Sequence, residues 1–186
     1  MLNNQLKSDL HKQQLLPILN TTNLESDIAR LKKYLNQNKT IEYIEITLRE
    51  KESFYIAVEL KKYFSDCKFG LGSVLTKEDL IRGQDHNFNF YVSPGIIDEI
   101  IEMKNPSYIP GAETVSEFIY LNKKGYEIIK FFPANLNGEE KKLQSIVNIL
   151  KDIKFIPTGG VNKDNIKKYL DLKNVLCVGT SNFEEF

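Results

Sequence analysis

Two charged residues stand inside apolar, strand-like runs of this sequence. Lys130 lies in "EIIKFFP" (127–133), and Glu45 lies in "IEYIEITL" (41–48). A charge among such neighbours is costly unless it is paired or neutral. Burial disfavours the charged form of a lysine, and a neutral lysine amine is a nucleophile that forms Schiff bases with carbonyl compounds. That chemistry requires proton transfers, which a nearby carboxylate such as Glu45 could perform.

The spacing around both residues predicts that they face one interior. Glu45, Thr47 and Arg49 are two residues apart, so in a strand their side chains point to the same face. Lys130 shares a face with the second residue on either side of it. If the two faces line one interior, an amine and a carboxylate meet near an arginine. The alternative is a buried ion pair that only fills the interior, which is weak evidence for stability.

Two glycine-containing segments end the last two expected strands. They are "PTGG" (157–160) and "GTS" (179–181). In barrels of parallel strands, the loops after strands 7 and 8 recurrently bind phosphate, because glycine lets an anion approach the backbone N–H groups. The alternative is that these glycines only make tight turns.

Short apolar runs alternate with amphipathic segments along the whole chain, which predicts strands alternating with helices. The order favours a parallel sheet covered by helices, and eight units close a (β/α)8 TIM barrel. The alternative is an open doubly wound sheet. No helix is expected after the eighth strand, although one is possible before the first. The expected strands are 15–20, 41–48, 68–75, 88–94, 107–111, 127–133, 154–160 and 174–181, and the expected helices are 24–37, 52–64, 77–84, 95–104, 114–124, 139–152 and 162–173.

Length and composition predict one compact domain, residues 1–186. Lys+Arg and Asp+Glu balance at 25 each, which gives no reason to expect a nucleic acid or an anionic membrane as partner. The cysteines Cys67 and Cys177 stand singly and read as buried, inert thiols; with only two histidines, His11 and His86, a metal site is not expected. The chain shows no secretory signal pattern and no long apolar run, so a cytoplasmic protein is expected.

Seven motifs in order resemble the 2-keto-3-deoxy-6-phosphogluconate (KDPG) aldolase / 4-hydroxy-2-oxoglutarate (KHG) aldolase family. The most specific are "E-x-T-x-R" and "KFFPA". This family consists of class I, Schiff-base aldolases on a (β/α)8 barrel, usually homotrimers, which need no metal or other cofactor. The motifs are "EITLR" (45–49), "GLGSVL" (70–75), "YVSPG" (91–95), "IPGAETVSE" (109–117), "KFFPA" (130–134), "PTGG" (157–160) and "VLCVGTS" (175–181).

The resemblance implies a role for each matching residue. Lys130 corresponds to the lysine that forms the Schiff base and Glu45 to the general acid/base. Arg49 corresponds to the arginine that grips the substrate carboxylate, in a pocket lined by Ser73 and Pro94. The other expected substrate-binding residues are Thr47, Thr158 near the substrate hydroxyls, and Gly159, Gly160, Gly179, Thr180 and Ser181 around the phosphate.

The implied reaction is the reversible cleavage of KDPG into pyruvate and glyceraldehyde 3-phosphate. The alternatives are the aldol cleavage of 4-hydroxy-2-oxoglutarate or of the galactonate epimer, and a phosphosugar-binding barrel without catalysis. The sequence departs from the family pattern at Ser73, where threonine is usual, and at Thr180, where a second glycine is common.

Overall fold

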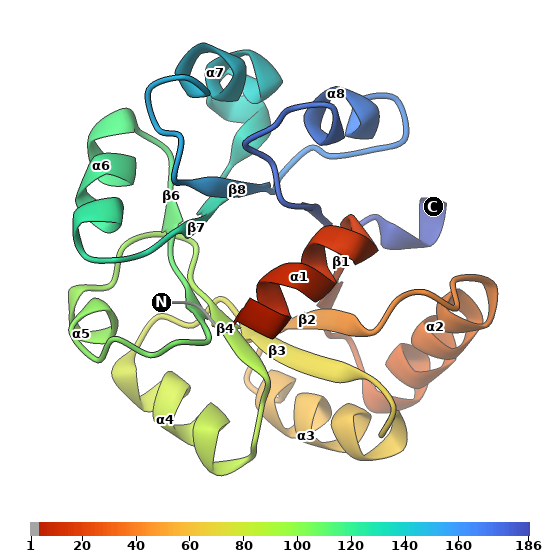
Figure 1. Cartoon of the computed structure of the whole chain (residues 1–186). Helices are drawn as coiled ribbons and strands as arrows, with labels where there is room; N and C mark the ends of the chain where they lie inside the picture. Colours follow the sequence, from red (N-terminus) through yellow and green to blue (C-terminus); the bar gives the residue numbers. More distant parts are fainter. Residues whose placement is uncertain (1–3) are drawn as a thin grey trace.

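The computed structural model of the protein describes residues 4–186, in which parallel strands alternate with helices (Figure 1). Each of the eight expected strands is present. The expected fifth strand is divided in two at Pro110, whose carbonyl oxygen accepts a hydrogen bond from the backbone N–H of Lys130 at 2.9 Å. The strands are β1 (Leu15–Asn20), β2 (Tyr43–Thr47), β3 (Lys68–Gly72), β4 (Phe90–Val92), β5 (Tyr108–Ile109), β6 (Gly111–Ala112), β7 (Ile128–Phe131), β8 (Lys154–Pro157) and β9 (Val178–Thr180).

The strands make a curled parallel sheet. The alternative, an open doubly wound sheet between two layers of helices, is not observed. One set pairs in the order β5-β4-β3-β2-β1-β9 and the other in the order β6-β7-β8. Two parallel bridges, Phe155↔Val175 and Thr158↔Gly179, connect the region of β8 to that of β9. The curl brings strands far apart in the sequence, such as β2 and β7, to face each other.

Seven helices follow the strands and surround the sheet (Figure 1). Thr76 and Thr114 begin two of them with complete capping boxes, of which the first was expected from the sequence. They are α2 (Leu24–Gln37), α3 (Ser53–Tyr63), α4 (Lys77–Asp85), α5 (Asp98–Ile101), α6 (Val115–Lys123), α7 (Glu139–Ile146) and α8 (Ile166–Leu170).

Three helices, α5, α7 and α8, are shorter than the sequence predicts, and α8 has an identifiable physical reason. The side chain of Asn162 accepts hydrogen bonds from the backbone N–H groups of Asp164 and Asn165, and the side-chain oxygen of Asn165 accepts one from the backbone N–H of Asn162. Asparagine side chains that bond local backbone groups compete with helix formation. The helix expected over 162–173 therefore begins only at Ile166.

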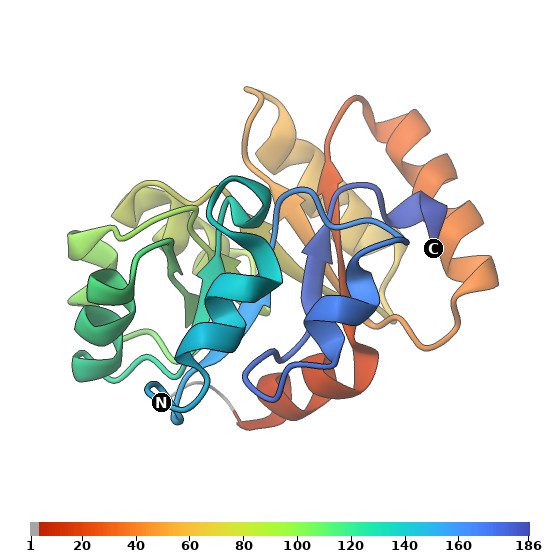
Figure 2. The same ribbon diagram turned by 90° about the horizontal axis from the view of Figure 1, so that it is seen from above.

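The sequence allowed for one helix before the first strand, and this helix is present as α1 (Asn4–Gln13). It lies across the end of the sheet where β1 begins, as Figures 1 and 2 both show. Leu6 and Leu10 are buried there against the interior side chains. The Gln13 amide ties α1 to two strands, because it donates to the carbonyl oxygens of Leu15 and Tyr43 and accepts from the N–H groups of Glu42 and Tyr43.

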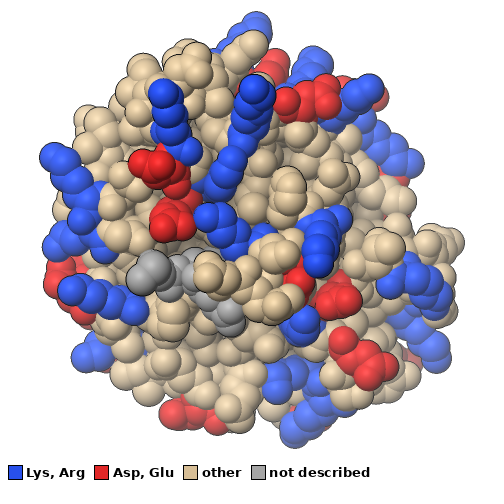
Figure 3. Space-filling view, in the orientation of Figure 1, with Lys and Arg blue, Asp and Glu red and all other residues tan. Residues whose placement is uncertain are grey.

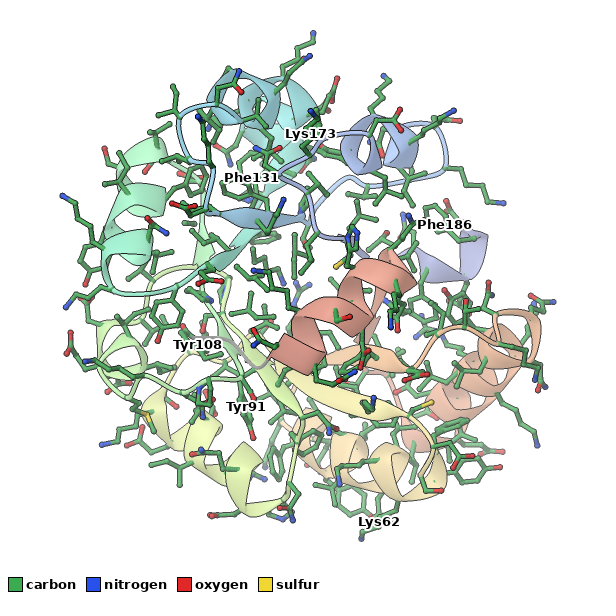
Figure 4. The ribbon with its side chains drawn as sticks, viewed as in Figure 1. Lys62, Tyr91, Tyr108, Phe131, Lys173 and Phe186 are labelled. Atoms are coloured by element: carbon green, nitrogen blue, oxygen red, sulfur yellow. The ribbon has the colours of Figure 1, made fainter. Side chains whose placement is uncertain are left out.

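The alternation of side chains along each strand divides the core into two layers. Ile44, Ile46 and Phe131 pack outward against the helices, where the much larger of two apolar clusters lies. In Figure 4, Phe131 and Tyr91 lie within the ring of helices, whereas Lys62 projects from its outer edge. The smaller, interior cluster comprises Leu6, Leu10, Leu16, Tyr43, Phe90, Val92, Ile109, Ile128, Ile156, Leu176 and Cys177.

After β9 the chain makes a single turn of 3-10 helix, η2 (Phe183–Glu185), and no further α-helix in the part that the structure describes. Phe183 is fully buried with its ring centroid 4.9 Å from that of Tyr34. The Arg30 guanidinium binds the Glu184 carboxylate at 2.9 Å and lies over the Phe183 ring. The C-terminal turn is thus fastened to α2.

The surface carries both signs of charge. On the face shown in Figure 3, basic and acidic side chains are interspersed, in keeping with the equal numbers of the two in the sequence. Among residues 4–186, no helix has the length and apolar character needed to cross a membrane.

Candidate active site

Lys130 and Glu45 meet in the interior, which confirms the geometry expected from the sequence. The Lys130 ammonium donates to Glu45 Oε1 at 3.1 Å across 85 positions of the sequence. The side chains of Lys130 and Glu45 are only 8% and 1% exposed. At this distance the Glu45 carboxylate is within reach to exchange a proton directly with the Lys130 amine.

Strand alternation explains how these two groups reach the interior. Lys130 follows Ile128 by two positions on β7, and Glu45 follows Tyr43 by two positions on β2; Ile128 and Tyr43 both belong to the interior cluster. The isoleucines beside Glu45 in the sequence therefore face the helices. The apolar context that makes the charges look misplaced belongs to the other side of each strand.

Gly72, the last residue of β3, provides the space that Glu45 occupies. A Cβ atom at this position would collide with Glu45 Oε1 and with the carbon atoms next to it. Gly72 pairs in register with Thr47, two residues beyond Glu45 on β2. A glycine is therefore required here so that the carboxylate can lie against the backbone of the neighbouring strand.

Arg49 lies at the edge of the same site. It follows β2, is exposed, and lines a cavity of about 90 Å³ together with Lys130. No ion pair to Arg49 is formed by any residue from 4 to 186. Its guanidinium is thus available to an anion from outside the chain. The cavity is lined by Ile18, Asn20, Arg49, Lys130, Phe132, Thr158, Gly159, Gly160, Val161, Thr180, Ser181 and Asn182.

The loop after β8 brings Thr158, Gly159 and Gly160 into the cavity. Both glycines have positive φ angles, +99° and +73°, which residues with side chains rarely adopt. The loop is held against the one after β7, because the N–H groups of Ala134 and Asn135 donate to the carbonyl oxygens of Thr158 and Gly159.

The end of β9 brings Thr180 and Ser181 to the same cavity, next to the β8 loop. Gly179 forms the bridge with Thr158 and is not itself a lining residue. The Thr180 hydroxyl donates to the Val161 carbonyl at 2.9 Å and accepts from the N–H of Asn182. The threonine that replaces a common glycine thus joins the two loops.

Ser73 and Pro94 end neighbouring strands β3 and β4, yet neither lines this cavity. Both are half-buried, and Ser73 has a φ of +56°, an uncommon conformation for a residue with a Cβ. The adjacent Ser93 is fully buried, donates to the Val74 carbonyl at 2.6 Å and accepts from the Tyr108 hydroxyl at 2.7 Å. These bonds fix the backbone at the ends of both strands.

Thr47 is buried, and its hydroxyl donates to Asn20 Oδ1 at 2.9 Å. Glu45 and Thr47 do not line the cavity themselves; Glu45 reaches it through Lys130, and Thr47 reaches it through Asn20. Sequence reasoning did not identify Asn20 as a site residue. The available signal was its place as the last residue of the first expected strand.

Sequence reasoning also missed Ile18, Phe132, Val161 and Asn182 as lining residues. Phe132 directly follows β7, and the Lys130 ammonium lies 5.5 Å from the centroid of its ring. The "KFFPA" motif could have indicated this position, because Phe132 stands two residues after the lysine in it.

The two cysteines differ in their surroundings. Cys177 is fully buried in the interior cluster, where burial and the nearby Glu45 carboxylate raise the pKa of its thiol. Cys67 was expected to be buried but is only half-buried, at the position directly before β3; burial raises the pKa of its thiol too. Within residues 4–186, no group of three or more His, Cys, Asp and Glu side chains is placed to hold a metal ion.

Comparisons with known proteins identify the family of the chain. The family model "KDPG and KHG aldolase" matches residues 6–186. The chain is 33% identical over 144 residues to the KHG/KDPG aldolase of Escherichia coli K12, covering 76% of this chain and 68% of the relative. It is 31% identical over 169 residues to the 2-dehydro-3-deoxy-phosphogluconate aldolase of Pseudomonas aeruginosa, covering 89% and 76%.

Among solved structures, the fold matches a KDPG aldolase from Legionella pneumophila in which pyruvate is captured as a covalent carbinolamine intermediate. The TM-score is 0.86 at 32% identity, over 94% of this chain and 85% of that one. A family model that spans nearly the whole chain, together with relatives above 30% identity, establishes membership. The chain belongs to the KDPG and KHG aldolase family and is an aldolase, a carbon–carbon lyase.

Proposed function

We propose that the protein reversibly cleaves KDPG into pyruvate and glyceraldehyde 3-phosphate through a Schiff base on Lys130. The observation that carries this proposal is the 3.1 Å contact between the Lys130 amine and the Glu45 carboxylate in a buried site that opens on a cavity. An isolated ion pair at this depth contributes little to stability, whereas a lysine that can pass its proton to a neighbour becomes a nucleophile.

The reaction begins when Glu45 takes a proton from the Lys130 ammonium. The neutral amine attacks the C2 carbonyl carbon of the substrate, and the resulting carbinolamine loses water, with Glu45 returning its proton to the departing hydroxyl. The product is an iminium ion, which accepts electrons from the adjacent carbon–carbon bond. The 3.1 Å separation lies within the range required for direct proton transfer.

Cleavage follows when Glu45, again a carboxylate, removes the proton of the C4 hydroxyl, directly or through a water molecule. The electrons of the C3–C4 bond move into the iminium ion, which becomes an enamine, and the aldehyde leaves. Protonation of the enamine at C3 by Glu45 gives the iminium of pyruvate. Water then hydrolyses this iminium, which releases pyruvate and restores the Lys130 amine.

The other site residues hold the two ends of the substrate in this proposal. The Arg49 guanidinium binds the C1 carboxylate in a bidentate manner. Ser73 and Pro94, which follow β3 and β4 outside the cavity lining, are assigned by resemblance to the same end of the substrate. The phosphate lies against the loops after β8 and β9, which contain Gly159, Gly160 and Ser181. The proximity of these two loops and the glycine conformations support that assignment.

We also propose that the sheet closes into a (β/α)8 barrel that forms one domain and that three copies associate. The two bridges between the β8 and β9 regions support the closure. Association would cover exposed apolar side chains such as Leu136, which is 77% exposed. Light scattering on a size-exclusion column tests the trimer, and a monomer at micromolar concentration would refute it.

The substrate is tested by measuring pyruvate release from KDPG, from its galactonate epimer and from 4-hydroxy-2-oxoglutarate. The proposal predicts the highest kcat/KM for KDPG. The value for 4-hydroxy-2-oxoglutarate should be lower because only phosphorylated substrates use the loops after β8 and β9. 4-Hydroxy-2-oxoglutarate is the alternative substrate, because the KHG/KDPG name of the Escherichia coli relative includes both compounds. Equal or higher kcat/KM for 4-hydroxy-2-oxoglutarate would assign the protein to the unphosphorylated substrate.

A further inference from the structure

Asn20, the last residue of β1, offers a hydrogen-bond donor to the cavity that the described chain does not use. Its side-chain Oδ1 accepts the Thr47 hydroxyl proton at 2.9 Å. The Thr47 hydroxyl also lies 3.4 Å from the carbonyl oxygen of Leu19, which is the more distant of its two acceptors. Within residues 4–186, the Asn20 amide nitrogen donates no hydrogen bond, although Asn20 lines the cavity.

The orientation of Asn20 is fixed from both sides. Thr47 is 1% exposed, and its single hydroxyl proton holds the oxygen side of the amide. The backbone carbonyl of Asn20 accepts a hydrogen bond from Arg30 at 3.4 Å, and Arg30 also binds Asp27 and Glu184. A polar group held in this way loses little entropy when it binds a ligand, which is typical of a preorganised site.

The order of strands places Asn20 between the two ends of the substrate. β1 pairs with β2 on one side and with β9 on the other. Arg49 follows β2, and Ser181 follows β9. A substrate with its carboxylate at Arg49 and its phosphate at the β8 and β9 loops therefore passes the end of β1 with its central carbons.

The chemistry of the central carbons leaves few groups for an amide to bind. The C2 carbonyl carbon becomes bonded to Lys130, and C3 carries only hydrogen. The remaining polar groups are the hydroxyls at C4 and C5, both in the half that leaves as the aldehyde. Each hydroxyl oxygen can accept a hydrogen bond from an amide N–H.

We propose that Asn20 is a specificity-determining residue whose amide N–H groups donate to a hydroxyl of the aldehyde half of the substrate. Thr47 is the positioning residue that turns the amide to do so. This inference rests on the proposed Schiff-base function of Lys130. It predicts that Asn20 acts on the cleavage of the complete substrate and has no part in reactions of pyruvate alone.

The experiment compares two reactions of the same variants. One is the exchange of methyl protons of pyruvate with deuterium from the solvent, which needs the Schiff base but no aldehyde half. The other is the cleavage of KDPG. In Asn20→Leu, which preserves size but removes the amide, kcat/KM for cleavage is expected to fall about tenfold while exchange stays within about twofold of wild type.

Thr47→Val should reproduce the same selective loss more weakly, because it releases the Asn20 amide without removing it. Asn89→Leu is the matched control, since Asn89 is exposed before β4, at the opposite end of the strands. It should leave both reactions unchanged. Circular dichroism and thermal unfolding establish that each variant is folded.

Equal losses in cleavage and exchange would overturn the inference, because a merely structural role of Asn20 affects both reactions. Unchanged cleavage in Asn20→Leu would overturn it as well. If Asn20→Leu does not fold, the inference is tested by measuring cleavage and exchange in Thr47→Val instead. Absence of exchange in the wild-type protein would instead contradict the Schiff base on Lys130. Failure of the proposed function is therefore distinguishable from failure of the inference about Asn20.

Discussion

At the scale of single residues, Lys130 and Glu45 must form a stable buried ion pair and must also transfer a proton between them. A buried pair of charges loses hydration, and its Coulombic attraction recovers that loss only when the geometry is good. The 3.1 Å contact supplies this geometry. The proposed mechanism nevertheless requires the same pair to transfer a proton from Lys130 to Glu45, so that both groups become neutral. We interpret the pair as a site that lowers the stability of the fold but provides a reactive amine.

Removing one member of this pair should cost more stability than removing both. Lys130→Met leaves Glu45 buried without its partner, which is expected to lower the free energy of unfolding by about 3–5 kcal/mol. In Lys130→Met/Glu45→Gln, most of that loss should be restored, because no buried charge remains. Urea unfolding of the two single variants and the double variant measures the coupling. Additive losses would contradict a direct interaction between the two groups.

Arg49 should affect binding without affecting stability. It is exposed and has no ion-pair partner in the described chain, so Arg49→Lys is expected to leave thermal unfolding unchanged. A lysine keeps the charge but loses the bidentate geometry, so KM for the keto acid should rise about tenfold or more. Steady-state kinetics tests this, with Lys51→Arg on the exposed turn nearby as control. A KM like that of the wild type would remove Arg49 from the substrate site.

At the scale of elements, period-two alternation was the most informative signal in the sequence. It predicted the inward direction of Glu45 and Lys130 and the order of strands and helices correctly. The sequence could not reveal the division of the fifth strand at Pro110 or the Asn162–Asn165 turn that shortens α8. Pro110 has no backbone N–H to donate to the strand ladder, and the Asn162–Asn165 turn depends on local side-chain hydrogen bonds that compete with the helix. Periodicity registers neither effect.

Gly72 on β3 offers a test of how one element positions a group on another. Gly72→Ala places a Cβ where the Glu45 carboxylate lies, so the carboxylate must move away from its present position beside Lys130. We expect kcat to fall by at least about tenfold, since proton transfer depends on distances near 3 Å. Ser116→Ala on the exposed face of α6 is a control for the assay. Wild-type kcat in Gly72→Ala would contradict the close approach.

At the scale of the whole molecule, the two apolar layers and the site depend on one another. The helices bury the outer layer, α1 covers the start of the strands, and the residues that line the cavity lie at or near the opposite ends of the strands. Sequence reasoning located the main candidate groups but missed Ile18, Asn20, Phe132, Val161 and Asn182. Their presence in the cavity follows from how the ends of four strands converge in space, which no local pattern encodes.

Buried tyrosines should make the folded molecule sensitive to alkali. Burial raises the pKa of Tyr34, Tyr91, Tyr126 and Tyr169 to about 12, from an ordinary value of about 10. Because the unfolded chain releases these protons first, their contribution to stability is complete below about pH 10 and is lost as the pH rises toward 12. The free energy of unfolding should therefore fall over that range.

Denaturant unfolding between pH 8 and 11 measures this fall. The chain has nine tyrosines and no tryptophan, so tyrosinate absorbance follows the same groups directly. The native protein should ionise fewer tyrosines than the denatured protein at pH 11. Coincident titrations of the two states would show that burial does not shift these groups.

The central claim, that Lys130 is the nucleophile, is tested most directly by trapping. The protein is incubated with pyruvate and borohydride, digested, and examined by mass spectrometry for the reduced pyruvate adduct. We predict one adduct, on the peptide that contains Lys130, and none in folded Lys130→Met/Glu45→Gln. An active enzyme that yields no adduct, or an adduct on a different lysine, would contradict the account.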